Sequence, residues 1–141
     1  MAKQRGGLNI AAAKDVAAHE DEGQVVKLMD HDGEPLLYGA DDKPVTVTVA
    51  GSYSTRYRRA VDKQRRQMLK RPRSKVSAEE LFENTIEIEA ACVLAWEGIV
   101  DGADVVECNP ENAAMMLSTV PWFREQVQVA IEDHAGFFGN A

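Results

Sequence analysis

The clearest pattern in the chain is the alternation of valine and threonine at 45–49, which puts three valines on one face and two threonines on the other. A period of two predicts a strand with one buried face. Upstream, the apolar runs at 24–29 and 35–38 flank an Asp-Gly turn signal at 30–33, a pattern typical of an antiparallel hairpin. We therefore expect a small antiparallel sheet of two or three strands within residues 24–50.

Helix-start signals dominate the rest of the chain. Ser54, Ser77 and Asn109 are residue types favoured as N-caps, and Ser77 is followed by Glu80, which completes a capping box. Pro121 suits the first turn of another helix. We expect helices over 54–70, 78–96, 110–117 and 121–135.

Apolar residues at helical spacing predict which faces of these helices lie in the core. The rows are Leu81, Thr85, Ile88, Cys92 and Trp96 in the second helix, and Phe123, Val127 and Ile131 in the last. A further row of the last helix, Trp122, Gln126, Val129 and Asp133, is mixed. Trp96 and Trp122 both stand beside a glycine or proline boundary, and we expect both to be largely buried. After Gly136, which suits a helix end, Phe137 and Phe138 fold back or dock elsewhere.

The order of these elements predicts an α+β fold, with a small antiparallel N-terminal sheet followed by a mainly helical C-terminal part. Residues 1–22 are rich in alanine, glycine and charge, and we expect them to form an N-terminal arm in which 10–18 can form a short helix. Residues 23–141 are expected to form a single domain, since a chain of 141 residues can bury an adequate core.

Catalytic and metal-binding patterns are absent from the sequence. The histidines His19, His31 and His134 are far apart, without ligand spacing, and each is expected at the surface. The segment 30–34 lacks the full calcium-loop pattern. Two cysteines are too few for a disulfide framework, and Cys92 is expected to be buried. No apolar run approaches the roughly 20 residues of a membrane span, and no signal peptide is recognised. We therefore expect a non-enzymatic protein without cofactor, metal or membrane contact.

Charge is distributed very unevenly along the chain. The net charge is −7, yet residues 56–75 hold ten of the 16 basic residues and one acid, Asp62. This run carries +9, which leaves −16 on the remainder. Pairing with acidic segments or a protein partner, nucleic-acid contact and simple solvation all remain open. Because an acidic protein attracts DNA weakly at long range, we favour a partner-binding or self-association face made of Arg58, Arg59, Lys63, Arg65 and Arg66.

Three motifs in the C-terminal half point to a family. They are Trp96-Glu97-Gly98 after a helix, the helix start Asn109-Pro110-Glu111-Asn112, and a final helix with Pro121, Trp122, Phe123 and Gln126 followed by the pair Phe137 and Phe138. The chain resembles the tail assembly chaperones of long-tailed bacteriophages in these motifs. The DGEPL turn and the AGSYSTRYRRA segment extend the similarity to residues 24–138. His134 departs from the pattern, since relatives often have arginine there.

The resemblance implies a protein that binds the tape-measure protein in the host cell cytoplasm while tail-tube subunits polymerise, and that is absent from the mature virion. It adds the tail tube protein as a second partner, and Phe137 and Phe138 as candidate partner-binding residues. We also expect a homo-oligomer that does not bind nucleic acid. One alternative is a virion structural protein, either a head decoration or a tail-completion component. Another is a DNA-binding accessory protein that uses the basic run.

Overall fold

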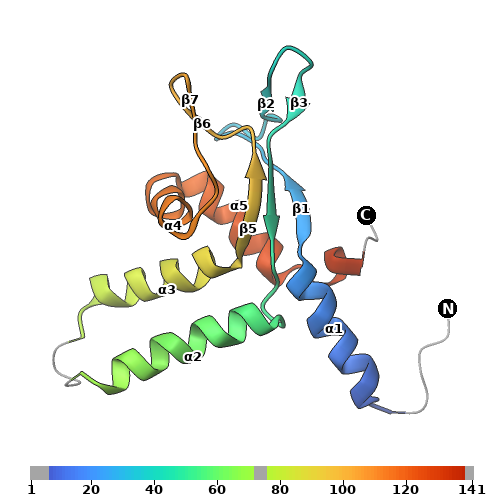
Figure 1. Cartoon of the computed structure of the whole chain (residues 1–141), viewed down its shortest axis with the longest axis vertical. Helices are drawn as coiled ribbons and strands as arrows, with labels where there is room; N and C mark the ends of the chain where they lie inside the picture. Colours follow the sequence, from blue (N-terminus) through green and yellow to red (C-terminus); the bar gives the residue numbers. More distant parts are fainter. Residues whose placement is uncertain (1–6, 72–75, 139–141) are drawn as a thin grey trace.

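The structure is a computed structural model that describes residues 7–71 and 76–138. Figure 1 shows a small central sheet with helices along one side and two short hairpins at one end. The elements are α1 (Ile10–Glu22), β1 (Gln24–Lys27), β2 (Leu37–Tyr38), β3 (Lys43–Pro44), β4 (Thr46–Val49), α2 (Thr55–Leu69), α3 (Ala78–Cys92), β5 (Val93–Glu97), β6 (Val100–Asp101), β7 (Asp104–Val105), α4 (Pro110–Thr119), α5 (Pro121–Glu132) and the 3-10 helix η2 (His134–Phe138). The fold is α+β, as predicted.

The main sheet has the strand order β1-β4-β5, and both pairings are antiparallel. The expected alternation in β4 is confirmed, because Val47 and Val49 are fully buried while Thr46 and Thr48 are half-buried. Val47 stands opposite Val26 on one side and Trp96 on the other. The valine face of the sheet therefore forms one wall of the core.

The third strand of this sheet comes from a segment that the sequence pattern predicted as helix. Helix α3 ends at Cys92, so the expected helix 78–96 is wrong beyond that residue. Residues 93–97 form β5, whose backbone pairs with β4. The next turn uses Gly98 at φ +88, where any side chain would strike the ring of Tyr38. Within α3 the buried face lies beside the expected apolar row, because Leu81 is half exposed whereas Ile86, which was expected to flank that row, is buried.

The N-terminal hairpin also differs in detail from its prediction. The turn at 30–33 is confirmed, with the Asp30 carboxylate accepting hydrogen bonds from the amides of Asp32 and Glu34. The expected return strand, however, meets the first strand only at the bridge between Met29 and Pro35. Its last two residues turn instead to the segment 43–44 and form the separate hairpin β2-β3.

All three predicted N-caps are confirmed. The side-chain oxygens of Ser54, Ser77 and Asn109 accept hydrogen bonds from backbone amides at the starts of α2, α3 and α4. The capping box at α3 is only half formed, because the Glu80 carboxylate pairs with Arg71. Helix α4 extends to Thr119, beyond the expected 117, while α5 ends at Glu132 and gives way to η2 before residue 135.

The core lies between the valine face of the sheet and helices α3, α4 and α5. Phe123, Val127 and Ile131 are buried as predicted. Trp96 is 9% exposed, meets Phe123 edge to face, and donates its indole N–H to the Val106 carbonyl. Trp122 is 39% exposed, so the expectation that it belongs to the core is wrong. It begins α5 on the outer side of that helix, near the 30–33 turn.

Helix α1 projects from the body of the protein, which it meets at its C-terminal end (Figure 1). It is longer than the short helix expected at 10–18, and its last turn carries Glu20, which is fully buried. The segment expected as an arm therefore ends inside the packed domain. No helix in the described ranges combines the length and the apolar character needed to cross a membrane.

Candidate partner-binding surfaces

The five basic residues predicted as one surface lie on two different rows of α2. Arg58 and Arg65 share one row, and Arg59, Lys63 and Arg66 share the other, because residues three, four and seven positions apart align on a helix. All five are exposed. Arg65 is 3.7 Å from Asp62, an exposed ion pair of little energetic weight. The structure thus divides the predicted patch into two separate surfaces.

Pairing between the basic helix and the acidic helix that follows it is sparse. Within the described part of the chain, the ion pair between these regions joins Arg71, which follows α2, to Glu80 of α3. Two further polar links join the helices: a hydrogen bond of 2.5 Å from the Gln64 amide to the Glu87 carboxylate, and one of 3.2 Å from the Asn84 amide to the Met68 sulfur. Most of the positive charge of α2 is therefore free to face a partner.

The row containing Arg59 and Lys63 forms one wall of a groove between α2, α3 and the start of α4. The groove has a volume of about 620 Å³. Its opposite side carries the acids Glu87 and Glu111. Four alanines line it between these charged walls: Ala60, Ala90, Ala91 and Ala114. The groove therefore has small side chains in the middle and charged ones at its edges, with opposite signs on its two sides.

A second concavity of about 320 Å³ lies where the β2-β3 hairpin, the segment after β5 and the first turn of α5 meet. We call it the apolar cup. Its deep part is formed by buried core residues, among them Leu28, Val45, Ile99 and Phe123, and its outer part by Met29, Leu37, Val100, Met116 and Trp122. Leu37 and Val100 are more than half exposed, and Trp122 is 39% exposed. The cup thus offers a concave apolar surface beside an aromatic ring.

Gln126 fixes one side of the cup. Its side-chain amide accepts a hydrogen bond of 2.7 Å from the Met29 N–H and donates one of 2.9 Å to the Met29 carbonyl. These two bonds satisfy the exposed backbone of Met29 as a neighbouring strand would. They also hold the edge of the sheet against α5, beside Trp122.

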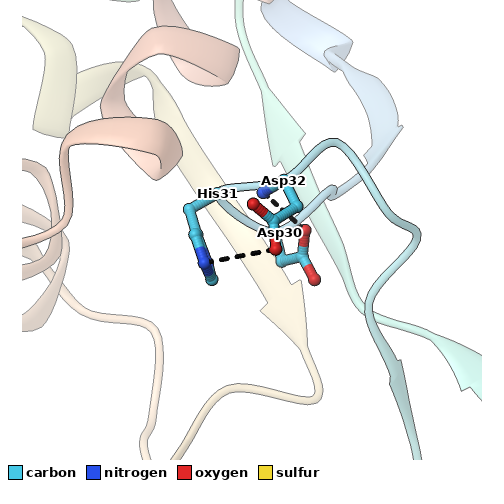
Figure 2. A group of neighbouring side chains, drawn as sticks. All are labelled: Asp30, His31 and Asp32. Carbon is cyan, nitrogen blue, oxygen red and sulfur yellow. Dashed lines mark hydrogen bonds and ion pairs between the residues drawn. The ribbon is translucent and has the colours of Figure 1, made fainter.

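The turn next to the cup carries the only close group of metal-ligand side chains found among the described residues, Asp30, His31 and Asp32 (Figure 2). One oxygen of Asp30 already accepts two backbone amides, and His31 lies 3.4 Å from Asp32. The amide bonds lower the pKa of the Asp30 carboxyl below its usual value. His31 and Asp32 are exposed, and the His31 ring tilts against Trp122 at 5.6 Å. The contacts among these side chains and the backbone are those of a turn stabilised by Asp30.

The buried carboxylate of Glu20 joins the two ends of the described chain. One oxygen accepts the Tyr53 N–H at 2.9 Å, and the other lies 2.6 Å from Nδ1 of His134. The His134 ring stacks on Tyr53 with centroids 3.7 Å apart. Gly51 makes room for this arrangement, since a Cβ there would overlap the Glu20 carboxylate. His134 is therefore a structural partner of α1, which corrects the expectation of a simple surface histidine.

The two phenylalanines predicted as partner-binding residues have different environments. Phe137 is 6% exposed, so the native surface does not present it to a partner. Phe138 is 44% exposed and stacks on His19 of α1 at 4.6 Å. Both help to hold η2 against the base of α1, and this burial removes Phe137 from the candidate binding surface.

A hydroxyl, an imidazole and a carboxylate lie in a row, as in a catalytic triad: Ser52, His134 and Glu20. The groups around them do not support such catalysis. The Ser52 hydroxyl is 3.5 Å from the His134 ring and donates to Glu132 at 3.2 Å. The amides that could stabilise an oxyanion are already used, since those of Ser52, Tyr53 and Ser54 bind the Ile131 carbonyl, Glu20 and the Gly51 carbonyl. The arrangement of these three residues is instead that of an anchor, which fastens Glu20 of α1 to the rest of the protein.

Comparison with known families decides the origin of the chain. Residues 52–137 match the family described as YdaY prophage protein, which covers more than half of the chain. The chain belongs to this family. The YdaY match runs from just before α2 to η2, so it includes the basic helix, the alanine-lined groove and the α4–α5 side of the cup. Comparisons with curated proteins and with solved structures gave no match. YdaY membership shows that the protein is phage-derived.

Proposed function

We propose that this YdaY-family protein is a tail assembly chaperone that binds the tape-measure protein while the tail tube is built. The observation that carries the proposal is the apolar cup, because a chaperone for an aggregation-prone chain must offer an apolar surface in its own folded state. The resemblance of residues 24–138 to tail assembly chaperones supports the same role. The phage origin of the family agrees with it.

The composition of the cup suits a partner with varied apolar side chains. Met29 and Met116 have flexible, polarisable side chains that adapt to different shapes, and Trp122 supplies a rigid aromatic anchor. An amphipathic helix that lays its apolar face against such a surface is a common mode of recognition. We therefore assign the cup to apolar residues on one face of a tape-measure helix.

Acidic residues lie next to residues that line the cup, which specifies the partner further. Asp32 and Glu34 lie in the turn beside Trp122, and Glu97 accepts a weak hydrogen bond from the Tyr38 hydroxyl. A tape-measure segment with lysine or arginine beside its apolar residues would gain from this charge. Its association should be faster at low salt, since exposed charges are screened over about 10 Å at 0.1 M ionic strength.

Co-expression with the tape-measure protein of the same prophage tests the proposal. Combining Trp122→Ala with Leu37→Ala should reduce the co-purified tape-measure protein about tenfold or more, because both side chains stand at the open side of the cup. The matched control is Val105→Ala, which removes an apolar side chain that is 80% exposed on β7 and outside the cup. Equal loss in the control and the cup variant, or no loss in either, would rule the cup out as the binding surface.

Mass spectrometry of purified virions tests the alternative, that the protein is a structural component of the virion. A chaperone should be missing from finished particles, whereas a head decoration or tail-completion protein should be present in many copies. Recovery in many copies would therefore replace the chaperone with a virion component. A salt-dependent DNA gel shift that disappears on reversing the charge of α2 would instead favour the DNA-binding role.

A further inference from the structure

The alanine-lined groove between α2, α3 and α4 has the features of a helix-binding site. Small side chains along its floor allow the backbone of an incoming helix to approach closely, and its walls offer charge. The wall on α2 is basic, with Arg56, Arg59 and Lys63, and the opposite wall is acidic, with Glu87 and Glu111. A helix that fits must therefore have a small-residue face with acids on one flank and a base on the other.

A buried polar atom in this groove shows independently that a donor is missing. Gln64 lines the groove and is 6% exposed. Its Nε2 donates to Glu87, while its Oε1 is the one buried side-chain oxygen or nitrogen in the described part of the chain that has no hydrogen-bond partner. Because buried polar groups are nearly always satisfied, this oxygen points to a ligand that brings a donor next to Glu87.

The outer face of α1 has the complementary pattern. Ala11 and Ala18 are seven residues apart and share the middle of this face, with Lys14 on one flank and Asp15 and Glu22 on the other. All five residues are exposed. A helix of 13 residues that packs only at one end is marginally stable by itself, so further contacts along α1 would stabilise it.

We propose that the protein assembles head to tail, with α1 of one copy lying in the α2–α3–α4 groove of the next. Figure 1 shows α1 pointing away from α4, so the helix does not lie in the groove of its own chain. In the assembly, Asp15 and Glu22 face Arg59 and Lys63, and the ammonium group of Lys14 meets Glu87, with Gln64 Oε1 accepting from it once the Gln64 side chain turns toward the groove. This contact is heterologous and repeats from copy to copy, forming a ring or an open chain.

Complementary charge reversal tests this arrangement in the full-length protein. The groove variant combines Arg59→Glu with Lys63→Glu, and the arm variant combines Asp15→Lys with Glu22→Lys. Sedimentation velocity should show oligomers for the native protein and monomers for each variant alone. An equimolar mixture of the two variants should regain the native size. In the mixture the native arm of the groove variant fits the native groove of the arm variant, and the reversed arm fits the reversed groove.

The matched control reverses two charges on the other row of α2, Arg58→Glu with Arg65→Glu, and should assemble normally. Circular dichroism checks that every variant is folded. A monomeric native protein, or a groove variant that assembles normally, would overturn the proposal. A groove variant that assembles normally but loses the tape-measure protein would assign the groove to that partner. The proposal is separate from the cup, since Trp122→Ala with Leu37→Ala should leave the oligomer intact.

Discussion

The core around the sheet and the attachment of α1 are stabilised by different interactions. In the core, Val47, Val127 and Phe123 exclude water through close apolar packing. Helix α1 is attached through a few polar contacts and one aromatic stack. The Glu20 carboxylate binds the Tyr53 amide and His134, the Glu20 carbonyl accepts the Gly51 N–H, the Asp21 carboxylate accepts the Arg56 N–H, and Phe138 stacks on His19. Apolar burial is spread over many contacts, whereas the anchor of α1 depends on a few directional bonds.

This contrast implies that the two regions unfold separately. Loss of a core side chain weakens every element that shares the core, so it should lower the global stability. Loss of the Glu20 anchor should release α1 while the sheet and α5 remain folded, as expected for a local opening. A projecting helix that can detach and redock is suited to exchange between copies.

The largest effect should come from Trp96→Ala in the core. Trp96 is 9% exposed and donates a hydrogen bond to the Val106 carbonyl, so truncation leaves a cavity and an unpaired acceptor. We expect a loss of about 3–5 kcal/mol in the free energy of unfolding, measured by urea denaturation. A loss below about 1 kcal/mol would mean that Trp96 is not a core residue.

The next effect should come from Glu20→Ala, which removes the anchor of α1. The Tyr53 amide and the His134 ring lose their partner, at a cost of about 1–3 kcal/mol. Hydrogen exchange should accelerate along 10–22 but not in β4. Glu83→Ala, at an exposed position of α3 outside the groove and the cup, is the control and should change neither. Uniform acceleration in both regions would show that α1 and the core form one cooperative unit.

A third effect should appear in alkali. Burial raises the pKa of the Cys92 thiol to about 12, from 9.0 for a thiol exposed to water. The unfolded chain therefore loses this proton first as the pH rises, and between about pH 9 and 12 the free energy of unfolding falls. At pH 10 the loss should be about 1.4 kcal/mol, because one pKa unit corresponds to that amount.

Urea denaturation of the native protein and of Cys92→Ala across pH 8 to 10 measures this alkaline effect. The variant should be less stable throughout, because it leaves a cavity in the core, but its stability should change less with pH. Parallel curves for the two proteins would show that Cys92 does not cause the decline.

The smallest effect on stability should come from Trp122→Ala. Its ring is 39% exposed at the cup, so we expect a cost of about 1 kcal/mol, a fraction of the value for Trp96. The same denaturation series compares the two tryptophans directly. A cost equal to that of Trp96→Ala would place Trp122 in the core and weaken the case for the cup as a binding surface.

Local signals in the sequence predicted much of the fold. The Asp-Gly turn, the alternating strand and the three caps each depend on residues within a few positions of one another, and all are found in the structure. The strand at 93–97 was missed because Cys92 and Trp96 continue the helical spacing of α3. Its backbone hydrogen bonds are to β4, more than 40 residues away in sequence, and such pairing overrides local periodicity.

The candidate surfaces were less predictable, for a similar reason. Helical spacing already separates Arg58 from Arg59 on α2, but the groove beside Arg59 depends on α4, which the basic run cannot reveal. Trp122 lies on the mixed row of α5, with Gln126 and Asp133, rather than on the apolar row of Phe123. That row was the available signal that Trp122 faces outward. No local pattern relates Glu20 to a histidine 114 residues away.

The pairing of Glu20 with His134 also sets an order of events during synthesis. The two residues are separated by 114 positions, so His134 must leave the ribosome before this contact can form. The sheet needs only residues up to 97, and it can pair earlier. Closing the longer loop costs more chain entropy and comes later. On a polysome that carries many nascent copies, α1 of each chain is therefore undocked at its base until His134 has emerged.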